Sequence, residues 1–181
     1  MDIILVIGII LFTLLLVGLG LFFYSKTWEM EFGENVYVIK TRQGQITDHA
    51  KGGKFTVVPL IDEYFLVPLD RYPLTFKASA YSEGLIEEKQ EHPGQLRWQI
   101  TDPMRAFNRF GGVTAEVQST ITEVNDVLRN LAETNTKQIL EEWSWERDKT
   151  HRPLDEVVLE SMNELVEPWG ICVENLTIRT D

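Results

Sequence analysis

The chain has 181 residues, of which 44% are hydrophobic and 25% charged, a composition that excludes a disordered protein and suits one globular domain with an appendage. Acidic residues outnumber basic ones by 28 to 17, and the net charge of −11, with no Lys/Arg-rich block, argues against nucleic acid as a partner. A single cysteine, Cys172, excludes an intramolecular disulfide and a cysteine-based zinc cluster.

The first segment predicts a membrane anchor. From Ile3 to Phe23 the sequence runs for 21 residues without a charge, and an α-helix of that length covers ~30 Å, the thickness of a bilayer's hydrocarbon core. No basic residue precedes it and no small-residue cleavage site follows it, which disfavours a cleaved signal peptide. We therefore expect one transmembrane helix in a retained anchor of residues 1–27, with Tyr24 and Trp28 as aromatic anchors at the membrane interface.

The basic residues near this segment set its expected orientation. No Lys or Arg precedes it, whereas Lys26, Lys40 and Arg42 follow it. The positive-inside rule therefore places the remainder of the chain, a domain of residues 28–181, in the cytoplasm.

The first half of this domain predicts an antiparallel meander. Residues 35–40, 54–58, 74–81 and 95–100 have the composition and alternation of strands, and glycine pairs and prolines punctuate them. The acidic, polar stretch of residues 83–94 predicts a hairpin tip or loop.

The second half predicts helices. Asp102 is expected to cap a short helix over residues 103–110, which Gly111 and Gly112 end. A helical period then begins at Ile121, and Asn135-Thr136 is expected to cap a separate, second helix.

A further helix and a strand complete the prediction. Pro153 is expected to open a helix with Leu165 among its inward residues, which Pro168 stops. Gly170 then makes the turn into a closing strand over residues 171–178. Strands, then helices, then a strand make the class α+β, an antiparallel sheet with packed helices behind one transmembrane helix.

No residue pattern predicts catalysis. Cys172 as a nucleophile would need a nearby cation or histidine, yet His49, His92 and His151 lie in polar, loop-like stretches with no visible relation to it. A small buried hydrophobe on the closing strand is the favoured interpretation. The histidines lack metal-ligand spacing, and the acidic stretch lacks the pattern of a calcium loop. We therefore expect no enzyme activity, no catalytic or metal residue and no cofactor.

Two tryptophans stand out in the stretch "EEWSWERDK". On a helix, Trp143 and Trp145 point to different sides, so one of them is less buried than the other. Exposed tryptophans are common interface anchors, which makes the pair a candidate interface. The alternative is that both pack within the domain.

Four stretches, taken in order, resemble the SPFH (band 7) family of stomatin, prohibitin, flotillin and the bacterial protease regulators HflK and HflC. The likeness covers residues 28–180 and rests on the order and spacing of a glycine-initiated strand with an I-D turn, a D-P dipeptide, an L-R helix and a W-G-I-x-V strand. These stretches read "GGKFTVVPLIDEYFLVPL", "LRWQITDPMRAF", "VLRNLAETNTKQIL" and "LVEPWGICVENLTI".

The resemblance implies a non-enzymatic scaffold of membrane microdomains or a regulator of a membrane protease, with lipid, further copies of itself and an integral-membrane protein as partners. Two departures are expected to matter. The stretch from Tyr81 to Gln95 replaces the family's T-x-D-G strand, and no coiled coil follows the closing strand, so we expect a short member of the family.

Other functions stay open on these observations. A narrow accessory subunit of one membrane complex would not self-associate. A membrane-bound hydrolase would use Cys172, and a pilus subunit would need a buried glutamate and a basic leader that the apolar segment lacks.

Overall fold

The computed structural model describes residues 3–25, 28–59, 61–81, 89–110, 117–150 and 152–179. Its contacts divide the chain into two compact units. The first consists of Met1–Glu34 and Val38–Tyr64, and the second of Asn35–Tyr37 and Phe65–Asp181. Both contain antiparallel strands, and packed helices join them in the second, so the predicted α+β class is confirmed.

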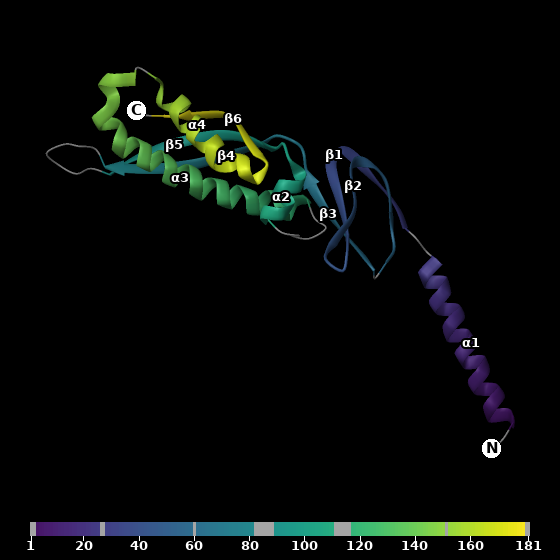
Figure 1. The fold of residues 1–181 in the computed structure, drawn as a ribbon. Helices are drawn as coiled ribbons and strands as arrows, with labels where there is room; N and C mark the ends of the chain where they lie inside the picture. The colour runs from purple at the N-terminus through teal and green to yellow at the C-terminus, as the bar shows by residue number, and fades with distance from the viewer. Residues whose placement is uncertain are drawn as a thin grey trace. The chain divides into compact units, whose positions relative to one another are not determined.

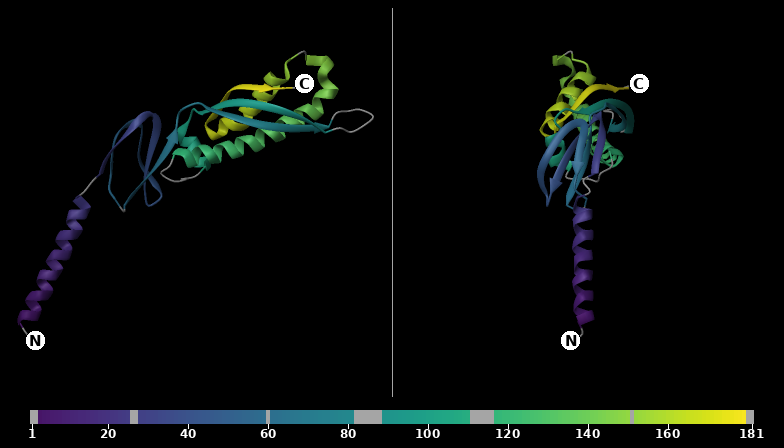
Figure 2. Two further views of the ribbon diagram at one scale, coloured as in Figure 1. Left: turned by 180° about the vertical axis from the view of Figure 1, so that it is seen from behind. Right: turned by 90° about the vertical axis from the view of Figure 1, so that its right-hand side faces the viewer.

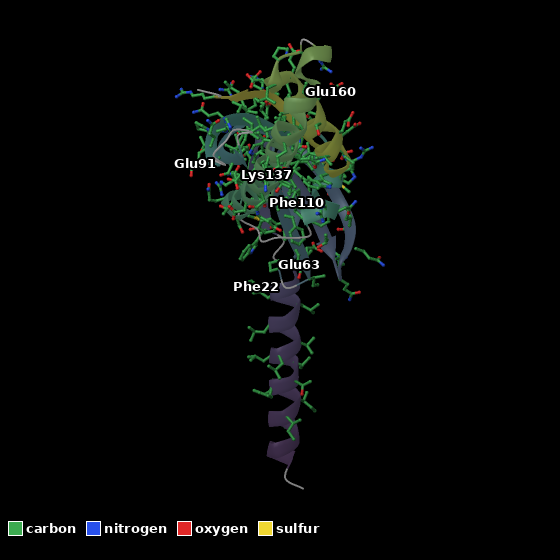
Figure 3. All side chains as sticks on the ribbon, turned by 90° about the vertical axis from the view of Figure 1, so that its left-hand side faces the viewer. Phe22, Glu63, Glu91, Phe110, Lys137 and Glu160 are labelled. Atoms are coloured by element: carbon green, nitrogen blue, oxygen red, sulfur yellow. The ribbon has the colours of Figure 1, made fainter. Side chains whose placement is uncertain are left out.

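The N-terminal segment is a helix, α1, which runs over Ile3–Ser25. Thr13 donates its hydroxyl to the carbonyl oxygen of Ile9 at 2.8 Å, which satisfies the one polar side chain in the middle of the helix. Side chains are described for residues 7–22, where the large apolar ones are 45–63% exposed and project on both sides of the helix in Figure 3. Among the residues described in this way, no helix is long and apolar enough to span a membrane, so the predicted transmembrane helix is not confirmed.

The first sheet is built from β1 (Trp28–Arg42), β2 (Gln45–Val57) and β3 (Asp62–Pro68), in the order β2-β1-β3. Gln43 and Gly44 both have positive φ, 52° and 77°, which is the geometry of a two-residue hairpin turn. The apolar side chains that this sheet buries include Val38, Ile39, Phe55, Val57 and Val67.

The second sheet has the order β4-β5-β6 and is antiparallel throughout, with β4 at Tyr72–Tyr81, β5 at Lys89–Ile100 and β6 at Ile171–Ile178. A register shift between Arg97 and Trp98 interrupts the β5–β6 ladder. Residues alternate along each strand between a buried face and an exposed face. The buried face carries Leu74, Phe76, Ala78, Leu96, Trp98, Ile100, Ile171, Val173, Leu176 and Ile178.

Helices cover the buried face of the second sheet. α3 (Val117–Thr150) packs on β4 and α4 (Leu154–Val166) packs on β6, as Figure 1 and the reverse view in Figure 2 show. A short helix, α2 (Pro103–Phe110), follows β5, and a 3₁₀ turn, η1 (Glu167–Trp169), joins α4 to β6. Three predictions are therefore confirmed: the short helix after Asp102 is α2, the helix that opens after Pro153 is α4, and the closing strand is β6.

The separate helix predicted to begin at Asn135-Thr136 does not exist, because α3 is continuous over 34 residues. Asn135 is 8% exposed and Thr136 is 0% exposed, so both side chains are packed inside the second unit. Ser161 of α4 donates its hydroxyl to Asn135 Oδ1 at 3.1 Å. Packing against α4 therefore overrides the capping preference of these residue types.

Three further expectations are corrected. The strands form two three-stranded sheets rather than one, and β5 begins at Lys89, so residues 89–94 are strand and not loop. Leu165 is 43% exposed, and Val166 takes the inward position at the end of α4. Residues 89–94 were predicted to be a loop because the exposed face of β5 is polar. The inward positions of α4 follow the spacing i, i+4 and i+8 through Val158, Met162 and Val166, which leaves Leu165 beside them on the exposed side.

Candidate functional site

The D-P dipeptide caps α2. Asp102 Oδ1 accepts hydrogen bonds from the backbone N–H groups of Met104 and Arg105, both at 3.1 Å. The Arg105 guanidinium lies 3.2 Å from the other carboxylate oxygen. The cap satisfies two backbone donors that the first turn of a helix leaves open.

The W-G-I stretch meets this same cap. The carbonyl oxygen of Gly170 accepts the backbone N–H groups of Thr101 at 2.8 Å and Asp102 at 3.0 Å. Gly170 has a φ of 71°, and a Cβ on it would clash with the carbonyl oxygen of Asp102. Glycine is therefore required both by the left-handed backbone and by the close approach of the two segments.

An aromatic contact closes the junction beside them. The rings of Phe110 and Trp169 meet edge to face with centroids 6.2 Å apart, and the Arg109 guanidinium lies 4.9 Å from the centre of the Trp169 ring. The start and end of α2 are thus both fixed to the turn that leads into β6.

Side chains from the helices bond to both edges of the second sheet. On the β6 edge, Asn163 of α4 accepts the N–H of Val173 at 2.8 Å and donates to its carbonyl at 2.9 Å. Asp155 accepts the N–H of Ile178 at 2.9 Å. On the β4 edge, Glu133 of α3 accepts the N–H of Lys77 at 3.3 Å. These bonds occupy groups that could otherwise pair with another strand.

Replacing Asn163 with alanine tests this arrangement. The variant leaves the N–H and C=O of Val173 without their partner, so we expect the free energy of unfolding to fall by about 1–3 kcal/mol. Urea denaturation measures the change, and hydrogen exchange should show faster exchange at the Val173 amide. Glu164→Ala, an exposed neighbour on the same helix, is the matched control and should stay within about 0.5 kcal/mol of wild type. An Asn163→Ala effect no larger than the control would contradict the edge role.

The I-D turn holds an ion pair in the first unit. Asp62 has a side chain that is 1% exposed, and its Oδ1 lies 2.8 Å from Nε of Arg42. Its Oδ2 accepts the backbone N–H of Val58 at 2.9 Å. The hydrogen bond from Arg42 lowers the pKa of the Asp62 carboxyl below its usual range, against the opposing effect of burial. The pair ties the end of β1 to the turn before β3.

The lone cysteine has no visible catalytic partner among the described residues. Cys172 is a free, half-buried thiol on β6 opposite Gln99 of β5. His92 is on the same strand as Gln99 but seven residues away, about 23 Å at the rise of a strand. The loop-like placement expected for two histidines is wrong, because His92 is buried on β5 and His49 is an exposed residue of β2. His151 lies outside the described residues.

Across the described ranges, no group of three His, Cys, Asp or Glu side chains is placed to hold a metal ion. The described residues offer three kinds of surface: the apolar side chains of α1, the strand edges bonded by helix side chains, and the polar exposed face of the second sheet.

The family model described as SPFH domain / Band 7 family matches residues 31–180. The chain belongs to the SPFH domain / Band 7 family. The comparison with curated proteins finds no match for this chain. SPFH proteins are in general non-enzymatic scaffolds associated with membranes, and they typically oligomerise there.

The stretches that carry the SPFH resemblance have structural roles in this protein. The D-P and W-G-I stretches form the Asp102–Gly170 junction, and the I-D turn forms the Arg42–Asp62 pair. In this protein the SPFH stretches therefore contain residues that hold two chain segments together. Asp62 does so through its side chain, and Gly170 does so because it has no Cβ.

The residues predicted as interaction sites are only partly described. Trp143 and Trp145 belong to α3, and Tyr24 to α1, but their side chains lie outside the described residues. Trp28 is the first residue of β1 and is 60% exposed. The candidate interface and the aromatic anchors therefore remain predictions.

Sequence reasoning missed Asn163, Glu133 and Asp155, which bond to the strand edges. The available signal was Asn163 itself, a polar residue next to the inward Met162 on a helix whose other inward positions are apolar. Its partner could not be read from the sequence, because any backbone group of a nearby strand would satisfy it.

Proposed function

We propose that this SPFH protein is a non-enzymatic, single-pass membrane protein anchored by residues 1–27, with residues 28–181 forming its domain. At the membrane it binds further copies of itself, an integral-membrane partner such as a protease, or both. The function is to scaffold or restrain those partners rather than to transform a substrate.

The apolar surface of α1 carries the proposal. Its 23 residues correspond to about 35 Å of helix, and the sequence from Ile3 to Phe23 holds no charge. The large apolar side chains that the structure describes on this helix are each about half exposed. They belong to residues 7, 9–12, 14–17, 19, 21 and 22. Soluble proteins rarely leave a contiguous apolar surface of this size in water, whereas lipid would cover all sides of the helix.

Orientation and lateral contact complete the proposal. Lys26, Lys40 and Arg42 favour a cytoplasmic domain under the positive-inside rule, and the exposed Trp28 has the amphipathic ring that suits the interface. Anchoring confines the domains to two dimensions and raises their effective concentration, so weak lateral contacts suffice for self-association.

Placing two arginines in α1 tests the anchor. In Leu11→Arg/Leu14→Arg, each charge at the centre of a transmembrane helix costs about 2.5–3.5 kcal/mol of insertion free energy, so the variant should fail to enter the membrane. Wild-type protein should remain in the membrane pellet after alkaline carbonate extraction, and the variant should move to the supernatant.

Ile46→Arg supplies the matched control, because Ile46 is an exposed apolar residue of β2 outside α1. This control should fractionate with the wild type. Wild-type protein that carbonate releases into the supernatant would overturn the proposed anchor.

A further inference from the structure

α3 has two buried polar side chains near its middle. Asn135 and Thr136 are 8% and 0% exposed, within a helix that is continuous over Val117–Thr150. Asn135 accepts a hydrogen bond from Ser161 through Oδ1, but its Nδ2 and the Thr136 hydroxyl oxygen have no partner among the described residues. Buried polar groups are nearly always paired, because an unpaired one loses its water without a replacement. The continuous helix is therefore locally destabilised at this point.

The packing of α3 changes at the same point. Before it, the helix buries four apolar side chains, those of Ile121, Val124, Leu128 and Ala132. After it, none of the described side chains of residues 137–141 is buried, and the apolar Ile139 and Leu140 are only half-buried. Figures 1 and 2 show that α3 turns away from the direction of its first part toward its C-terminal end. Packing thus holds the described residues beyond Thr136 less firmly than those before it.

The residue types at this point are those that begin helices. Asparagine is among the best N-cap residues, because its side-chain oxygen accepts an N–H group of the first turn. Gln138 follows three residues after Asn135, which is the spacing of a capping box. A helix that opened here would leave the N–H groups of residues 136–138 without carbonyl partners, and Asn135 would supply an acceptor for one of them.

We propose that Asn135–Thr136 is a hinge in α3. In the closed state, which the structure shows, the helix is continuous. In the open state, residues 117–134 stay packed in the second unit, and residues 137–150 form a distal helix that Asn135 caps. The distal helix is then free to change its direction. This inference goes beyond the proposed membrane function and does not depend on it.

The two states differ little in free energy. Opening removes the partners of three backbone N–H groups, but it adds a cap and releases the unpaired groups of Asn135 and Thr136 to water. The open state is therefore a minor state of the native protein. A partner that binds the distal helix in its changed direction would shift the population toward it.

Residue-resolved hydrogen exchange of the full-length protein in lipid nanodiscs tests the hinge. Opening at Asn135 exposes the amides of residues 136–138, while the distal helix keeps its own hydrogen bonds. We therefore expect a local minimum of protection at residues 136–138. Their amides should exchange at least about 10-fold faster than those of residues 124–132 on one side and 140–144 on the other.

Thr136→Val tests the cause of the opening. Valine has a shape close to that of threonine but lacks the unpaired hydroxyl, so we expect exchange at residues 136–138 to slow by at least about 5-fold. Thr134→Val is the matched control, because Thr134 is an exposed threonine of the same helix. This control should change the exchange of these amides by less than about 2-fold.

Two results would overturn the inference. Protection that is uniform across residues 124–144, or that declines steadily toward Thr150, would show that α3 frays from its end or stays closed and does not open at Asn135. Exchange that is as little changed in Thr136→Val as in Thr134→Val would show that the buried hydroxyl does not destabilise the continuous helix.

Discussion

Gly170→Ala is expected to lower the free energy of unfolding of the second unit by about 3 kcal/mol, made up of about 1–2 kcal/mol for an L-residue in the left-handed region and a similar amount for the clash. The new Cβ would press on the carbonyl oxygen of Asp102 and approach the Cβ atoms of Asp102 and Arg105 at 3.0 Å. Relief of that contact would weaken the bonds from Thr101 and Asp102 to the Gly170 carbonyl. Denaturation followed by tryptophan fluorescence, with Trp98 and Trp169 in this unit, measures the loss.

Gly44→Ala separates the two contributions. Gly44 has a φ of 77°, close to that of Gly170, but no atom lies within 4 Å of the Cβ it would gain. This variant should therefore lose only the backbone part, about 1–2 kcal/mol, measured by circular dichroism of the first unit. Equal losses in the two variants would show that the close approach of Gly170 to Asp102 contributes nothing.

Asp62→Ala is expected to lower the free energy of unfolding of the first unit by about 2 kcal/mol. The variant removes the acceptor of the Val58 N–H and leaves Arg42 without its partner. Arg42 is 48% exposed, so water replaces part of its interaction and the loss stays below the value for a fully buried pair. Asp48→Ala is the control, because Asp48 is 57% exposed and lies 3.7 Å from Lys40. A loss for Asp62→Ala as small as that for Asp48→Ala would contradict the anchoring role.

The same carboxylate sets a pH dependence. The pKa of Asp62 is lower in the folded protein than in the unfolded chain, chiefly because of the hydrogen bond from Arg42. Its contribution to stability is therefore fully present above the unfolded pKa, about 3.9, and is lost as the pH falls through the folded pKa. Asp62→Asn should lack this acid loss, so its stability relative to wild type should improve between pH 5 and pH 2 in a urea titration; an unchanged difference would contradict the assignment.

The parts of the fold that were predictable from sequence are those with local chemical signals. Asp102 followed by Pro103 predicted the start of α2, Pro153 predicted the start of α4, and Gly170 predicted the turn into β6. Each depends on a backbone preference of one residue, which acts wherever the chain is placed.

The errors arose where contacts distant in sequence decide the structure. Asn135 and Thr136 were predicted to cap a helix, but both are buried within a continuous α3, and Asn135 accepts a hydrogen bond from Ser161 of α4. His92 was predicted to lie in a loop because the stretch around it is polar, yet its side chain is buried on the inward face of β5.

The motif residues were recognisable, but their partners were not. The I-D turn and the W-G-I strand supported the family assignment, while the Arg42–Asp62 pair and the Gly170–Asp102 contact join residues 20 and 68 positions apart. Such pairs can be recognised only in the folded structure, because each residue alone is compatible with many different contact partners.

Membrane-anchored self-association is tested most directly by the copy number of the full-length protein in native membrane patches. The patches are extracted with a polymer that keeps the lipid, and the copies in each particle are counted by single-particle fluorescence. We expect particles that contain several copies each, and single copies for Leu11→Arg/Leu14→Arg outside the membrane fraction. Wild-type particles that carry one copy each, or none at all in the membrane fraction, would contradict the proposed scaffold.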